Sequence, residues 1–76
     1  MGKLIDMKPR KCYTIVKIDD NVQGVVKKRL VELGVVGGNK IVLLTKNSLA
    51  KSGIVRLLGS MICLDYFLLS SIEVQE

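Results

Sequence analysis

The segment of residues 29–41, RLVELGVVGGNKI, most constrains what this chain can fold into. It joins the end of an amphipathic helix to a glycine stop, a second glycine turn and the start of an apolar strand. Gly34 stands where the C-terminus of a helix favours a residue in the left-handed conformation. Gly37-Gly38 is typical of a tight turn, because glycine adopts a positive φ at no steric cost. The segment therefore predicts one helix that passes through glycine turns into a strand.

The one predicted helix covers residues 22–33. Its apolar residues recur at helical spacing and form a single stripe, made of Val22, Val25, Val26, Leu30 and Leu33. The polar side of the helix carries Lys27, Lys28 and Glu32. Asp20 is predicted to cap the N-terminus, with Gln23 at the spacing of a capping box. Arg29 borders the stripe, where it is either a structural side chain or a contact for a partner.

Five short strands are predicted, over residues 12–18, 40–46, 54–58, 61–64 and 72–74. Gly59-Ser60 is predicted to close a hairpin between the third and fourth of them. Five short strands and one core favour a mainly β fold, a small and partly open barrel with one α-helix inserted after the first strand. The expected core consists of Leu30, Leu33, Val35, Ile41, Leu43, Val55, Leu57, Ile62, Leu64, Ile72 and Val74.

Length and composition indicate one small cytoplasmic domain over residues 1–76. The mean hydropathy is +0.36, yet no apolar run approaches the roughly 20 residues that cross a bilayer. No signal-peptide pattern opens the chain. The net charge of +5 arises within residues 1–30, which hold eight of the 12 basic residues. Such a face can attract nucleic acid, anionic lipid or an acidic protein surface, but a solvated surface is the favoured explanation of a charge this modest.

The reactive side chains are too few for a catalytic or closed metal site. The chain has no histidine, so we expect no enzyme and no structural zinc site, and no cofactor is implied. Cys63 lies between two apolar residues and is expected in the core, and Cys12 is also expected to be a packed thiol near the surface. Asp19, Asp20 and Asn21 could suit a hard cation, but they are better explained as a turn and helix cap. We expect no tight binding of ferrous iron by this chain alone.

The order of elements resembles the ferrous iron transport protein A (FeoA) family. The most specific match is Arg29-Leu30-x-Glu32-Leu33-Gly34-Val35, followed by Gly38 and Ile41, and a second block matches at Gly59, Ile62, Leu64, Ile72 and Val74. The resemblance implies an SH3-like barrel and a small accessory protein of ferrous iron uptake. The implied partner is the membrane permease with a G-protein domain (FeoB). The same barrel also resembles the C-terminal module of iron-dependent repressors, which leaves a detached module for a peptide or transcriptional partner as an alternative.

Two surfaces are predicted to bind a protein partner. One is the helix, through Lys27, Lys28 and Arg29. The other is the apolar turn at residues 66–69, where Phe67 or Leu69 is expected to plug the barrel end while Tyr66 and Leu68 contact a partner or a second copy in weak self-association. Non-specific nucleic-acid binding is the distant alternative, because no basic residue is interleaved with the aromatic pair at residues 66–67.

Overall fold

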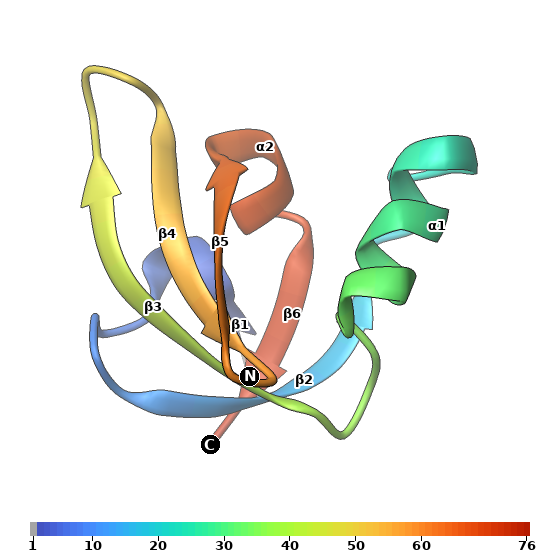
Figure 1. Ribbon diagram of the computed structural model, residues 1–76, viewed down its shortest axis with the longest axis horizontal. Helices are drawn as coiled ribbons and strands as arrows, with labels where there is room; N and C mark the ends of the chain where they lie inside the picture. Colours follow the sequence, from blue (N-terminus) through green and yellow to red (C-terminus); the bar gives the residue numbers. More distant parts are fainter. Residues whose placement is uncertain (1) are drawn as a thin grey trace.

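Six antiparallel strands form one sheet that coils into a partly open barrel (Figure 1). The structure, a computed structural model, describes residues 2–76. The strands are β1 (Gly2–Lys3), β2 (Cys12–Ile18), β3 (Lys40–Asn47), β4 (Ser52–Leu57), β5 (Ser60–Asp65) and β6 (Ile72–Gln75). The helices are the 3-10 turn η1 (Leu4–Asp6), α1 (Gly24–Leu33) and α2 (Tyr66–Leu69). The sheet order is β1-β6-β2-β3-β4-β5, so β1 and β5 are its edges.

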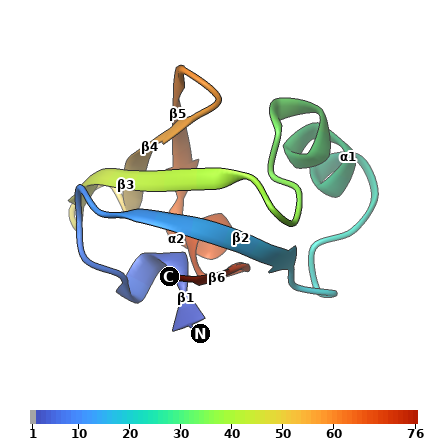
Figure 2. The same ribbon diagram turned by 90° about the horizontal axis from the view of Figure 1, so that it is seen from below.

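Two irregularities in the ladders help the sheet to curl. The register shifts between Ile15 and Lys17 where β2 pairs with β6, and between Leu43 and Thr45 where β3 pairs with β4. An extra residue in one strand increases its local twist and bends it. Seen from below, β2 and β3 cross the molecule while β4 and β5 rise away from them (Figure 2). The curvature encloses a core and leaves β5 unpaired on its outer side.

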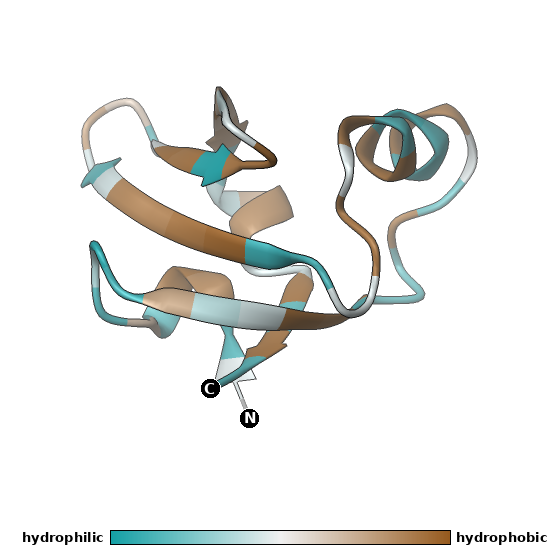
Figure 3. Cartoon of the chain, turned by 60° about the horizontal axis from the view of Figure 1, so that its bottom comes forward, coloured by the Kyte–Doolittle hydropathy of each residue, from teal (hydrophilic) through white to brown (hydrophobic). Residues whose placement is uncertain are grey.

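The core fills the inside of this curled sheet. Residues with no exposed surface come from most of the elements and are Leu4, Ile41, Leu43, Val55, Leu69, Ile72 and Val74. Hydropathy colouring shows apolar stretches along β3 and parts of α1 (Figure 3). All expected core residues are buried except Leu33 and Ile62, which are half-buried. The sequence reading also missed the burial of Leu4, Tyr13 and Val22.

The helix begins later than predicted and is capped differently. Gln23, not Asp20, occupies the N-cap position and makes no side-chain cap bond; its Nε2 instead donates to the Asp20 carbonyl at 3.2 Å. Gly24 adopts a φ of +64°, which residues with a Cβ rarely take, so the chain can turn into the helix there. The predicted glycine stop is confirmed, because Gly34 is left-handed with a φ of 106°.

The predicted strands are confirmed, with small shifts and one addition. The strand at Cys12–Ile18 has the predicted bounds. The hairpin turn is displaced by one residue: Leu58 and Gly59, with φ of 51° and 81°, form the loop between the paired residues Leu57 and Ser60. Two successive residues of positive φ are the signature of the type I′ turn, which suits the twist of a hairpin. The sixth strand is β1, too short to be recognised from two residues.

Candidate functional site

Helix α1 stands apart from the barrel and shows apolar side chains to solvent. Leu30 is its only buried residue, whereas Val25 is 84% exposed and Val26 is 48% exposed. Figures 1 and 2 show the helix beside the barrel, next to the hairpin of β4 and β5. A helix with an apolar stripe ordinarily buries it against a neighbour. The apolar stripe of α1 is therefore only partly buried within this chain.

A groove of about 360 Å³ separates α1 from β5 and α2. It is lined by Val25, Val26, Arg29, Leu30, Leu33, Ile62, Cys63, Leu64 and Leu68. Its volume falls in the lower part of the range of ligand and peptide sites, and its lining is mostly apolar with a single charged group. We call it the α1–β5 groove. It is the candidate functional site of the chain.

One end of the α1–β5 groove is fixed by a close contact between the helix and the hairpin tip. A Cβ built on Gly34 would lie 2.5 Å from Cδ1 of Leu58. The Leu58 side chain is exposed and flexible enough to move aside from a Cβ, so it is the φ of 106° that favours glycine here. Together with buried Leu30, this contact sets where the helix stands relative to β5.

The opposite wall is formed by β5 and the start of α2. Leu64 is buried, Ile62 and Leu68 are half-buried, and all three line the groove. The Asp65 carboxylate accepts a hydrogen bond from the Leu68 amide at 2.8 Å and so caps α2. Leu69 is fully buried beneath this wall, while Phe67 is 54% exposed. As expected, one residue of the pair at 67 and 69 plugs the barrel.

The predicted partner residues are brought together only in part. Arg29 and Leu68 line opposite walls of the α1–β5 groove. Lys27 lines a second hollow on another side of α1, with Val31, Val35 and Val36, and Lys28 is exposed on the helix. Tyr66 is half-buried against the core, with the Lys51 ammonium 6.0 Å from its ring centroid. The sequence predicted Val25 and Val26 only as part of the apolar stripe of the helix, not as a binding site. Their neighbours Gly24, Lys27 and Lys28 are the sequence signal that this part of the helix is exposed.

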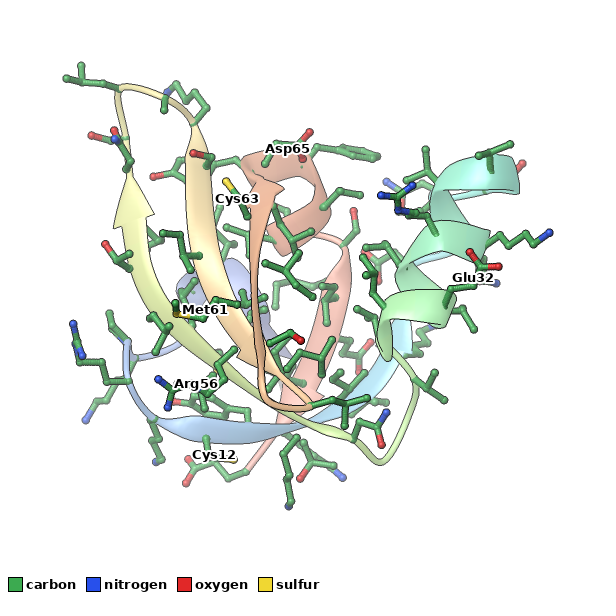
Figure 4. The ribbon with its side chains drawn as sticks, viewed as in Figure 1. Cys12, Glu32, Arg56, Met61, Cys63 and Asp65 are labelled. Carbon is green, nitrogen blue, oxygen red and sulfur yellow. The ribbon has the colours of Figure 1, made fainter. Side chains whose placement is uncertain are left out.

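Both cysteines are free and exposed, so the predicted packing of Cys63 in the core and of Cys12 is wrong, whereas Cys12 does lie at the surface as expected. Along β5 the side chains alternate, with Leu64 inward and Met61 and Cys63 on the opposite face. Figure 4 shows the Cys63 thiol on the side of β5 that is turned away from α1, on the same face as Met61 and Arg56. Cys63 therefore borders the groove through its main chain. The two-residue alternation of a strand could have placed this thiol outside.

The acidic turn before α1 is built by contacts within the chain. The Asp19 carboxylate pairs with the Lys3 ammonium, and its amide donates to the Ser71 carbonyl at 2.7 Å. Within residues 2–76 no three His, Cys, Asp or Glu side chains are arranged to hold a metal ion. The hydrogen bonds of Asp19 agree with the expected role of this segment as a turn.

The shifted pKa values belong to Lys11 and Glu76, neither of which lines the α1–β5 groove. A hydrogen bond from Lys11 at 2.8 Å lowers the pKa of the Glu76 carboxyl and raises the pKa of Lys11 itself. Of the two ion pairs found among residues 2–76, Lys3–Asp19 and Lys11–Glu76, neither includes Arg29. Arg29 thus meets the groove with its charge unpaired in the described part of the chain.

No helix within residues 2–76 combines the length and the apolar character needed to cross a membrane.

Comparisons with known proteins agree with the resemblance drawn from the sequence. The family model of the FeoA domain matches residues 3–76. The iron(II) transport protein A of Clostridium thermocellum has a TM-score of 0.84 and 25% identity, over 96% of this chain and 44% of that one. This chain thus spans less than half the length of that protein. None of the curated proteins matches the chain significantly.

Two further solved structures share the fold at lower identity. FeoA of Stenotrophomonas maltophilia, complexed with zinc and described as an SH3 domain protein, has a TM-score of 0.83 and 17% identity over 99% of this chain and 91% of that one. ScaR with bound Cd²⁺ has a TM-score of 0.83 and 18% identity, over the whole of this chain and 36% of that one. The predicted SH3-like barrel is confirmed.

Proposed function

Because the chain belongs to the FeoA family, we propose that it is a single-domain, non-enzymatic accessory protein of ferrous iron transport that docks on the cytoplasmic side of a FeoB-type permease. The observation that carries the proposal is the α1–β5 groove. The apolar lining of the groove continues into the exposed valines of α1, and an exposed apolar surface of this kind marks a protein contact. The protein then works in the cytoplasm by contact, with iron as the cargo of the permease.

The chemistry of the groove fits a protein partner better than a reaction. Its lining has one ionisable side chain that carries charge at neutral pH, Arg29, and a single exposed thiol at its border. Nucleophilic catalysis needs a base beside the nucleophile, and Cys63 turns its thiol to the other face of β5. Arginine is among the residues enriched at interface hot spots, and the apolar walls around Arg29 offer a partner a surface to bury. No cofactor is part of the proposal.

The nucleic-acid alternative is weakened by the positions of the aromatic residues. Stacking platforms need exposed aromatic faces beside basic groups. Tyr13 is 4% exposed and Tyr66 is half-buried, which leaves Phe67 as the exposed ring. Exposed lysines can still touch phosphates without sequence preference, which salt-sensitive binding to a random oligonucleotide would reveal.

A detached regulatory module is the second candidate function. The observation in its favour is that the same barrel makes up only 36% of the ScaR chain, so this fold also occurs as a part of larger proteins. In that case the groove would take a peptide or a transcriptional partner in place of the permease. Both functions use the same groove and differ in the partner.

The test measures binding of the full-length permease of the same organism, held in nanodiscs, to two matched variants. Val26→Glu places a charge in the groove, and Val31→Glu places the same charge on the same helix but in the second hollow. The two valines are similarly exposed, at 48% and 44%. We expect wild type and Val31→Glu to bind and Val26→Glu to lose binding. Absence of binding by folded wild-type protein would contradict the permease proposal.

A further inference from the structure

The outer edge of β5 carries unpaired main-chain groups that face the α1–β5 groove. β5 pairs with β4 alone. Leu57 and Ser60 flank the two-residue turn as its hydrogen-bonded pair, and the Tyr66 amide donates to the Lys51 carbonyl in the same phase of the ladder. Bonded and non-bonded pairs alternate along antiparallel strands. The N–H and C=O groups of Met61 and Cys63 therefore point away from β4, whereas Asp65, in the same phase, is the N-cap of α2.

This edge lacks the devices that usually protect an edge strand. Native edges are blunted by proline, lysine, bulges or a covering segment. The sequence of β5 is SMICLD, without proline or lysine, and no bulge interrupts its register with β4. Helix α1 lies opposite the edge, but the groove separates the two. Unprotected main chain beside an apolar wall is the arrangement to which extended peptides add a strand.

The two walls have comparable lengths, and the helix is the shorter. The six residues of β5 extend over about 20 Å, and the ten residues of α1 over about 15 Å. An extended segment of about four or five residues spans that distance. Its side chains would alternate, so that one set rests on Val26, Leu30 and Leu33 and the other faces the groove mouth.

Charge decides which extended segment fits. Arg29 lines the groove without an ion-pair partner among residues 2–76, and Lys28 lies exposed beside it on α1. The whole chain carries a net charge of +5. A second copy would bring the same positive charge and the single acidic residue of its own β5. An acidic partner segment is attracted where a second copy is repelled.

Resting on the proposed function, we infer that a short extended segment of the permease, with alternating apolar residues and at least one Asp or Glu, adds to β5 as a new strand between β5 and α1. Main-chain hydrogen bonds to Met61 and Cys63 hold it in register. Apolar side chains fill the groove, and a carboxylate pairs with Arg29. The segment completes the sheet edge and covers the exposed stripe of α1.

Proline substitutions on the edge separate main-chain pairing from side-chain contact. Cys63→Pro removes the outward N–H of that residue but no bond to β4, a position where an edge strand tolerates proline. Cys63→Ala removes the thiol and keeps the N–H, and is the matched control. Met61→Pro with Met61→Ala repeats the comparison two residues away if the first proline variant fails to fold. Circular dichroism checks the fold of each variant.

Affinity for the full-length permease in nanodiscs is the readout. We expect each folded proline variant to bind about tenfold more weakly than wild type, the effect of one lost hydrogen bond, and each alanine variant to bind within about twofold. Proline variants that bind like wild type would overturn strand addition and leave permease docking intact. Wild-type protein that does not bind would overturn the proposed function as well. A wild-type dimer in sedimentation that Cys63→Pro dissolves would assign the edge to a second copy and overturn the inference.

Discussion

Leu30→Ala should destabilise the protein strongly, because Leu30 is the one buried residue of α1. It is 2% exposed and lies in the core cluster. Losing three buried carbon groups costs about 2.4 kcal/mol of transfer free energy, at about 0.8 kcal/mol each. The remaining cavity adds to this, within the range of about 2–5 kcal/mol measured for such changes. The groove beside Leu30 lets neighbours close in, so we expect about 2–3.5 kcal/mol.

Urea unfolding followed by far-UV circular dichroism measures this loss. The same change should lower the melting temperature by about 8–28 °C, since a domain of this size shifts by about 4–8 °C per kcal/mol. Val25→Ala on the same helix is the control, because Val25 is 84% exposed. It should change the free energy of unfolding by no more than about 0.5 kcal/mol. Alanine also favours the helix slightly over valine.

Two results would refute this reasoning. If Val25→Ala costs as much as Leu30→Ala, the helix stripe is packed against a surface in solution and the α1–β5 groove is not open. If Leu30→Ala costs less than about 1 kcal/mol, Leu30 does not anchor α1, and the position of the helix beside β5 has another cause.

Four further predictions follow from single contacts. Gly34→Ala should cost about 1–3 kcal/mol in urea unfolding, because its φ of 106° opposes a Cβ while the exposed Leu58 side chain beside it can move aside. Gly38→Ala, with a φ of 97° and open space, should cost about as much, and a far larger loss at Gly34 would show that Leu58 cannot move aside. Asp65→Ala should cost about 1 kcal/mol through loss of the α2 cap, and an unchanged unfolding midpoint would show that the bond to the Leu68 amide contributes nothing. Cys12 and Cys63 should both react with a thiol reagent in the folded protein without denaturant, and a thiol that reacts only after unfolding would contradict its exposure. The pKa of Glu76 is lowered, so its bond to Lys11 stabilises the fold above the ordinary carboxyl pKa and stops doing so as the pH falls through the pKa of the folded state. Any difference in unfolding midpoint between wild type and Glu76→Gln should therefore vanish in acid. A difference that grows in acid would contradict this sign.

The strands were predictable because their signals are local. Alternation and β-branched residues placed the strand at Cys12–Ile18 with its correct bounds, and glycine marked the end of the helix at Gly34. The hairpin turn was displaced because Gly59 was taken as its first residue, while Leu58 accepts a positive φ that is rare for leucine. Strand β1 is defined by two residue pairs with β6. This contact is long-range, and a segment of two residues carries no local pattern from which it could be predicted.

The candidate site was predictable only in pieces. Arg29 and Leu68 were singled out, but the groove that joins them depends on where α1 stands relative to β5. An apolar stripe shows which side of a helix can be buried, but it does not show whether the same chain supplies the surface that buries it. Val25 and Val26 follow the helical period and are nevertheless exposed. Sequence reasoning therefore found the helix and missed that its apolar side is left for a partner.

Hydrogen exchange of the protein alone and with the full-length permease in nanodiscs tests the central claim most directly. If the permease docks in the α1–β5 groove, amide protection should increase in Gly24–Leu33 and in residues 60–69, and remain unchanged at residues 8–11 and 47–51. Protection confined to those two loops, or to the second hollow at residues 16–18 and 35–37, would contradict the account.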